Sequence, residues 1–438
     1  MSVKALEQQV VSSITDSIET KERIQVTDVT LEILIDKTTL DIENLVSLDI
    51  GASIHFDFPM ARITFVDTQE LIKKLLIKVG SSVTIKVIDS NNSSNVQQLS
   101  KLVVRKIRQV HTALNNATGP IMLECVHPFL IYQNFDSHCF GKTSASDIIQ
   151  QLLYSSDAFT SGIIDNTYVE INETDGDMTY NRYKCCESEM DFIKNKILPF
   201  CTINDEPPYF FMDEFGRFYL TNFTNMYNTE SSCVITNNTE YYESLRGSEK
   251  YSEKPIFLAD NIEIDIGGTR NLLENIKTRV ITEDVTSNKA FEFRTFPRLS
   301  YKGIKGTIAY PIDLSYIAMH NDSTGQTIRN IPYIDAANLQ WTNLRNFDDI
   351  IKLKIDLPFF VGMLNPVGST IDIDLFSDGD DDVNFWLNGK YVVAKNSYIT
   401  TDGDFDRIMT SLELIRPSLD FDSKTSIDSD IQKTLWTT

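Results

Sequence analysis

Apolar residues along the chain follow two spacings, one typical of strands and one typical of helices. Between residues 24 and 130 they recur at every second position, as in Val29–Ile33 and Val83–Val87, with turn-forming residues such as Gly80 between the runs. This pattern predicts a β-barrel or β-sandwich. The same alternation returns from Ile351 to Ile415. We therefore expect two separate β modules.

Apolar residues at helical spacing predict an amphipathic N-terminal arm over residues 1–23 and a helix at Thr68–Ile77 that crosses the first β module. Asn271–Ile281 is a further helix candidate. Short strands are expected nearby, at Ala290–Thr295 and Gly306–Tyr310.

The middle of the chain mixes both patterns. Thr143–Asp147 has the residues of a helix N-cap with an acidic first turn, and Ser188–Asp191 opens a second helix that should end before Pro199. Two aromatic runs flank Asp213–Gly216, which predicts a hairpin with glycine where positive φ is required. We interpret this region as a mixed α/β insert.

Among the features of composition, the net charge changes the expected function most. The chain has 438 residues, enough for two to four packed units, and its net charge of -22 repels phosphate. Specific binding of nucleic acid is therefore not expected. The first 23 residues have no signal-peptide core, and runs such as Leu357–Leu364 are too short to span a bilayer. We expect synthesis in the cytoplasm and no membrane insertion.

Candidate metal ligands occur as two pairs, Cys125 with His127 and His138 with Cys139. Their spacing matches no standard zinc pattern, so we interpret them as buried residues at a barrel end, and metal binding is left open. The adjacent Cys185 and Cys186 are interpreted as packing residues.

Other fragments resemble ligand loops without completing them. Gly141–Thr143 has Asp136 where a phosphate loop needs glycine, so we expect a turn into a helix cap. Asn172–Asp177 and Asp378–Asp382 lack the distant glutamate of a calcium loop and are interpreted as solvated turns. No cofactor is expected.

Hydrolytic motifs are missing from the chain. There is no Gly-x-Ser-x-Gly and no His-Glu pair, and the five histidines are scattered. A glycosidase needs only two carboxylates, however, and the chain has 62 acidic residues. Glycan hydrolysis stays the alternative to a structural role.

The order of these elements resembles a known family. The residues that carry the resemblance are Gly141–Leu153, the helix opening at Asp191, the hairpin Pro207–Leu220, and the closing strands Asn388–Val393 and Met409–Arg416, with a turn at Asp402–Phe405. Together they resemble the central hub proteins of contractile phage tail baseplates. The same architecture occurs at the N-terminus of the valine-glycine repeat spike proteins of type VI secretion.

The resemblance implies a β-rich α+β fold in which two small tube-like β-barrels flank a mixed α/β insert. It also implies a non-enzymatic homotrimer in the virion tail, acting as a symmetry adapter between a threefold central spike and a sixfold tail tube. Its expected partners are the spike, tail-tube or tube-initiator proteins, the tape measure protein and baseplate wedge proteins. DNA would pass through its channel without specific binding. A virion-associated cell-wall glycan hydrolase is the alternative.

These expectations divide the chain into a helical arm, a first barrel, an insert, a linking domain, a second barrel and a tail. The boundaries are, in order, 1–23, 24–135, 136–245, 246–346, 347–418 and 419–438. The tail is rich in Asp, Ser and Thr but carries Ile431, Leu435 and Trp436. These three apolar residues are the expected partner contacts.

Overall fold

A computed structural model gives the fold. The residues that it describes are 29–55, 57–68, 70–74, 76–89, 96–99, 101–111, 118–131, 133–141, 143–156, 169–175, 182–204, 206–239, 242, 245, 254–259, 261–266, 278–284, 289–295, 314–320, 351–358, 362, 364–375, 387–400 and 408–416.

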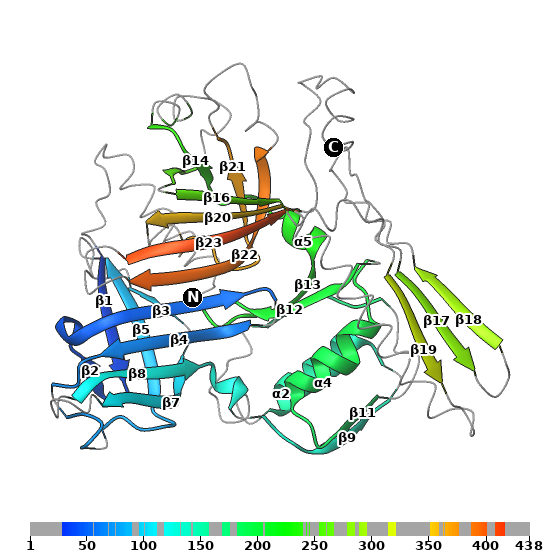
Figure 1. Cartoon of the computed structure of the whole chain (residues 1–438), viewed down its shortest axis with the longest axis horizontal. Coiled ribbons are helices and arrows are strands. Elements are labelled where there is room, and N and C mark those ends of the chain that lie inside the picture. The colour runs from blue at the N-terminus through cyan, green and yellow to red at the C-terminus, as the bar shows by residue number, and fades with distance from the viewer. Residues whose placement is uncertain are drawn as a thin grey trace.

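Strands dominate the described part of the chain, and helices are short (Figure 1). The strands are β1 (Val29–Ile35), β2 (Thr38–Leu40), β3 (Leu45–Ser53), β4 (Asp57–Phe65), β5 (Ser82–Asp89), β6 (Val96–Gln98), β7 (Leu102–His111), β8 (Thr118–Val126), β9 (Ser137–Phe140), β10 (Val169–Ile171), β11 (Arg182–Cys185), β12 (Pro208–Met212), β13 (Phe218–Asn222), β14 (Val234–Thr236), β15 (Ile256–Leu258), β16 (Asn261–Ile266), β17 (Thr278–Asp284), β18 (Lys289–Thr295), β19 (Leu314–His320), β20 (Ile351–Pro358), β21 (Thr370–Ile373), β22 (Gly389–Thr400) and β23 (Ile408–Arg416). The α-helices are α2 (Ala145–Ser155), α4 (Glu189–Phe192) and α5 (Phe223–Tyr227). The β-rich class expected from the sequence is confirmed.

One large curled sheet of 15 strands holds most of the described chain. Its first half is built from β1 to β8, and its second half from β14 to β16 and β20 to β23. The two halves meet where β22 pairs with β3 in antiparallel register, from Lys395 opposite Ser53 to Ile399 opposite Asp49. This pairing joins segments from opposite ends of the sequence into one structure (Figure 1).

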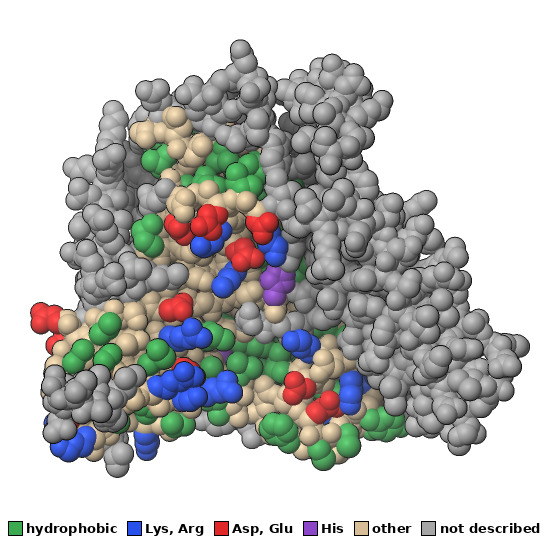
Figure 2. Space-filling view, viewed as in Figure 1, with side chains coloured by type: hydrophobic (Ala, Val, Ile, Leu, Met, Phe, Trp, Pro, Cys, Tyr) green, Lys and Arg blue, Asp and Glu red, His purple; other side chains and the backbone are tan. Residues whose placement is uncertain are grey.

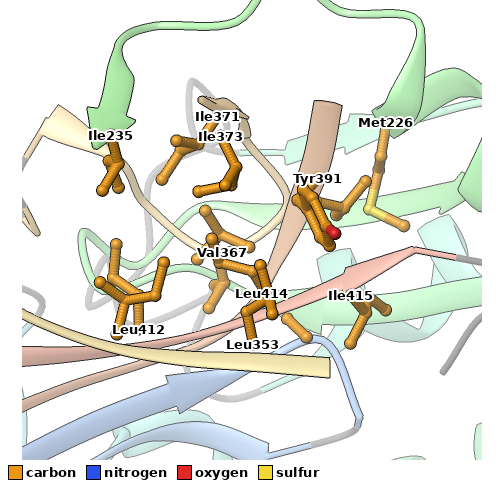
Figure 3. Packing of buried hydrophobic residues seen from close by; sticks show 14 of the residues in the cluster. Met226, Ile235, Leu353, Val367, Ile371, Ile373, Tyr391, Leu412, Leu414 and Ile415 are labelled. Atoms are coloured by element: carbon orange, nitrogen blue, oxygen red, sulfur yellow. The ribbon is translucent and has the colours of Figure 1, made fainter. Parts of the chain in front are cut away.

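Each half of the sheet encloses its own apolar core. Alternate residues such as Ile33, Ile85 and Leu123 fill the first core, as the period-two pattern requires. The second core collects Leu353, Tyr391 and Leu414 with other residues shown in Figure 3. Burying side chains of this size contributes about 1.5–3 kcal/mol each, so the two cores dominate the stability of the sheet.

The hairpin of β12 and β13 forms a plate between the second core and a third one. Tyr209 and Phe211 face the second core, whereas Phe210 and Met212 face the third. That third core also takes the buried face of α2 and the helix that starts at α4. The uninterrupted apolar run Tyr-Phe-Phe-Met follows from burial on both faces of the strand.

Helix starts and the hairpin in the middle region form where the sequence predicted them. Ser144 caps α2 by accepting from the Asp147 amide, and Ser188 caps α4 by accepting from the Asp191 amide. The second helix continues through a π turn, and Pro199 lies in the 3₁₀ turn that ends it. Gly216 has φ +83° between β12 and β13.

One helix prediction is wrong, and a second is contradicted over its last four residues. Thr68–Ile77 forms turns, because Asp67 caps the amides of Leu71 and Ile72 while Glu70 takes φ +55°, which a helix excludes. Leu71 and Ile77 still reach the first core. The last four residues of Asn271–Ile281 lie in β17, paired with β18 and β19.

Several predictions fall outside the described residues: the N-terminal arm, Gly306–Tyr310, Asp378–Asp382 and the tail with Ile431, Leu435 and Trp436. Ala290–Thr295 is confirmed as part of β18. Within the described part of the chain, no helix combines the length and apolar character that crossing a bilayer demands.

Candidate functional site: a buried acidic junction

The three cores come together around the turn between β12 and β13. Tyr398 on β22 belongs to the first core, although Tyr391 and Val393 on the same strand belong to the second. Phe215, in the turn, packs against the first core as well. The turn therefore reaches the line where β22 passes from one half of the sheet to the other.

Asp213 holds this turn together. Its Oδ1 accepts from the amides of Phe215 at 3.0 Å and Arg217 at 2.9 Å, and its Oδ2 accepts from the Tyr219 hydroxyl at 3.3 Å. The Arg217 guanidinium lies 4.0 Å from the same carboxylate. Burial outweighs these contacts and raises the pKa of Asp213 to about 6.

Glu214 follows Asp213 and lies in the buried acidic junction, the place where the three cores meet. Its Oε2 accepts from the amide of Val367, which belongs to the loop between β20 and β21, at 3.2 Å. Burial first, and the adjacent Asp213 carboxylate second, raise the pKa of Glu214 to about 8. At neutral pH Glu214 is therefore mainly protonated, which suits a carboxyl group in an apolar setting.

Asn396 on β22 completes the junction. Its Nδ2 donates to the Gly362 carbonyl at 2.9 Å and contacts the Tyr398 hydroxyl at 3.1 Å. Burial raises the pKa of Tyr398 well above its ordinary value, and Glu214 adds to the shift. These bonds tie the loop after β20 to the strand that links the two halves.

The buried acidic junction can hold parts of the protein together, but a polymer substrate cannot reach its carboxyl groups. Asp213 is 0% exposed and Glu214 is 1% exposed. A glycosidase places its two carboxyl groups in a cleft open to the sugar. The carboxyl pair with the largest pKa shifts in the described region is thus closed off from any glycan.

A second buried charge fixes the segment before β9. The Lys184 side chain is 1% exposed and donates to the Asn134 carbonyl at 2.5 Å and to Asp136. Glu189 lies 3.5 Å away and accepts from the Asn134 amide with both carboxylate oxygens. Burial raises the pKa of Glu189, whereas the hydrogen bond from Lys184 lowers that of Asp136. This cluster leaves Phe135 67% exposed on a fixed segment.

The four candidate metal ligands do not converge. Cys125 lies in the first core, and His127 caps a 3₁₀ turn by accepting from the Phe129 amide with Nδ1 at 3.2 Å. Their interpretation as buried residues is confirmed. His138 and Cys139 lie on β9 and are exposed, so the same interpretation is wrong for them. Among the described residues, no cluster of three His, Cys, Asp or Glu could hold a metal.

The packing interpretation of Cys185 and Cys186 is also wrong, because both are exposed. The reason is the pairing of β11 with β9, which turns Lys184 inward and leaves its neighbours outside. Cys186 has φ +50° and its Sγ lies 3.5 Å from the Ser137 hydroxyl.

The fragments that resemble ligand loops have local structural roles. Thr143 donates to Asp147 at 3.0 Å at the start of α2, which confirms the helix-cap interpretation of Gly141–Thr143. Asp175 accepts from Thr202 and from the Asn204 amide, so it closes a loop.

Sequence reasoning missed the junction residues. Asp213 and Glu214 were predicted only as turn residues, since Asp and Gly are common in solvated turns. The signal that could have found them is their setting: both acids follow four apolar residues and precede Phe215. Acidic residues inside an apolar run are burial candidates.

Comparison with known proteins gives structural matches without sequence matches. No family model matches the chain, and no curated protein matches it. A tail protein from Neisseria meningitidis MC58 is 9% identical, with a TM-score of 0.52 over 90% of this chain and 98% of that one. The 43 kDa tail protein of prophage MuSo2 from Shewanella oneidensis is 12% identical, with a TM-score of 0.52 over 89% and 98%.

These two matches cover nearly the whole of both chains. At such low identity they establish the fold and nothing further, so the class is defined by architecture: a β-rich chain with the fold of phage tail proteins. The resemblance found in the sequence is confirmed at this level. A component of the type VI secretion system of E. coli, 7% identical, matches with a TM-score of 0.44 over 89% of this chain and 80% of its own length.

Proposed function

We propose that this chain is a structural hub of a contractile phage tail baseplate. The observation that carries the proposal is the fold shared with two tail proteins along nearly their full length. The continuous sheet supports a mechanical role as well, because the β22–β3 pairing joins the two halves by backbone hydrogen bonds.

The two halves are proposed to be two tube-like barrel modules, residues 24–135 and 347–418, flanking the insert 136–245. In the sheet, the strands of residues 347–418 are joined by β14 from the proposed insert and by β15 and β16 from the proposed linking domain 246–346. Three copies would then present six similar modules. Such a homotrimeric ring could match a threefold spike on one side and a sixfold tube on the other.

The proposed ring between spike and tube indicates which partners to expect. We propose contacts with the central spike, tail-tube or tube-initiator proteins, the tape measure protein and wedge proteins, with Ile431, Leu435 and Trp436 of the tail among the contact residues. Because the chain carries a charge of -22, a ring of three copies would repel DNA and let it pass through the channel without binding.

A cell-wall glycan hydrolase is the weaker candidate. It requires two carboxyl groups that a glycan can reach, and the pair with strongly raised pKa values, Asp213 and Glu214, is buried. The same burial supports a structural role for this acidic pair.

Solution mass and peptidoglycan turnover test the proposal. Light scattering on the purified chain should give three times the 49.9 kDa of one copy, with no release of reducing ends from peptidoglycan. A stable monomer that degrades peptidoglycan would contradict the hub and favour the hydrolase.

A further inference from the structure

The outer face of the large sheet carries two rows of charged cross-strand neighbours, one in each half. In the second half, cross-strand neighbours run from Glu263 on β16 through Lys354 and Glu413 to Lys395 on β22. In the first half they run from Asp49 through Arg62 and Glu124 to Lys106 on β7. Because side chains alternate between faces, these residues share the surface opposite the cores.

The two ends of this face differ in charge. We call β16, β20 and β23 the acidic end; its outward residues are Glu263, Asp265, Asp356 and Glu413, against Lys352 and Lys354. Both lysines are engaged, Lys354 with Glu263 at 3.3 Å and Lys352 with Glu413 at 3.8 Å. The acids therefore outnumber the cations there.

At the other end the balance is reversed. We call the outward face of β4, β7 and β8 the basic face; it carries Arg62, Arg105, Lys106 and Arg108 against Glu124. Arg108 pairs with Glu124 at 2.7 Å, which leaves the other three cations in excess. Figure 2 shows the Lys and Arg side chains gathered over these strands.

The acidic end also includes an edge strand of the described sheet. Within the described part of the chain, β16 pairs with β20 alone and is an edge strand of the sheet. Glu263 has a side-chain exposure of 61%, and Ile264 beside it is 46% exposed. Charged residues on an edge strand restrict pairing to a complementary surface.

Two copies of a chain with charge -22 repel each other at long range, so a contact between a cationic and an anionic surface is favoured. We propose that the basic face of one copy docks on the acidic β16 edge of the next copy. This inference rests on the proposed function, since it supplies the head-to-tail contact that closes a ring. It also buries the excess cations between subunits, away from DNA.

Charge reversal on each side tests the contact. Arg105→Glu with Lys106→Glu should weaken self-association at least tenfold in sedimentation equilibrium, because like charges then face each other. Glu263→Lys with Asp265→Lys should weaken it similarly. The variant with all four substitutions should recover association to within about threefold of the unaltered chain, because each contact is complementary again.

Lys73→Glu with Lys74→Glu is the matched control, with the same charge change on exposed lysines in the turns between β4 and β5, outside both rows, and should leave association unchanged. Circular dichroism checks folding; if a reversed variant does not fold, Arg105→Gln with Lys106→Gln provides the measurement instead.

Unchanged association in the reversed variants, or no recovery in the fourfold variant, overturns the docking proposal while a trimer keeps the hub intact. A chain that stays monomeric at all concentrations contradicts both the docking proposal and the proposed hub function. Retardation of a DNA duplex by the unaltered chain, lost in the Arg105 and Lys106 variant, would assign the basic face to nucleic acid and also overturn the proposal.

Discussion

At the residue scale, burial determines the protonation of Asp213 and Glu214 at the junction. Asp213 retains four polar contacts and a pKa near 6, whereas Glu214, with the amide of Val367 and a carboxylate neighbour, has a pKa near 8. The native state therefore holds a proton on Glu214 that the unfolded chain, near 4.5, releases. Stability from this group is complete below about pH 4.5 and is lost as the pH rises towards 8.

Glu214→Gln should remove that loss, because the amide is neutral at every pH. We expect the variant to be more stable than the unaltered chain by roughly 4–5 kcal/mol at pH 8.5 and by less than about 1 kcal/mol at pH 5, measured by thermal unfolding across this range. Glu173→Gln, on an exposed loop, is the control and should keep the original pH dependence. An unchanged profile in Glu214→Gln would show that burial at the junction does not control the titration.

At the element scale, the loop between β20 and β21 packs closely against β22 and β23. A Cβ at Gly362 would lie 2.5 Å from the Thr410 side chain on β23 and 2.9 Å from the Tyr398 ring on β22. Gly362 also supplies the carbonyl that Asn396 binds. Close approach here brings Val367 within reach of Glu214, so the loop positions the junction.

Gly362→Ala should therefore destabilise the protein by about 2 kcal/mol, the usual cost of overpacking a close contact. Urea unfolding followed by tryptophan fluorescence and circular dichroism gives the value. Gly141→Ala is the matched substitution in open space, with no atom within 4 Å of the added methyl, and should change stability by less than about 0.5 kcal/mol. Equal effects of the two changes would contradict tight packing at Gly362.

At the scale of the whole molecule, one sheet joins both ends of the chain, and its net charge of -22 requires specific contacts for assembly. β23 ends at Arg416, whose guanidinium donates to the Asn388 carbonyl at 2.9 Å. The proposed tail, residues 419–438, follows this strand in the sequence, and we propose that it contacts a partner.

Deleting residues 419–438 should leave the melting temperature within about 2 °C while it impairs assembly with the spike and tube proteins, followed by analytical ultracentrifugation of mixtures. Trp436→Ala in the full chain should reproduce most of the loss, because buried aromatic anchors dominate interfaces. A deletion that unfolds the chain, or one that assembles normally, would contradict the proposed role of the tail.

Much of the local structure was predictable from the sequence. The caps Ser144 and Ser188, the glycine turn at Gly216 and the strands of both halves follow from side-chain chemistry and apolar spacing within a few residues. Thr68–Ile77 shows the limit of this reasoning: its apolar spacing is helical, but caps from Asp67 and the conformation of Glu70 made turns of it.

The sequence by itself determined a β-rich, acidic chain in two halves. Apolar alternation is a property of short segments, and composition and net charge are sums over the whole chain. Only the tertiary structure decided that β22 pairs with β3, that Asp213 and Glu214 are buried, and that Cys185 and Cys186 are exposed. The two rows of charges on the sheet also exist only after folding. Each depends on contacts between distant segments, and local patterns contain no information about which strands become neighbours.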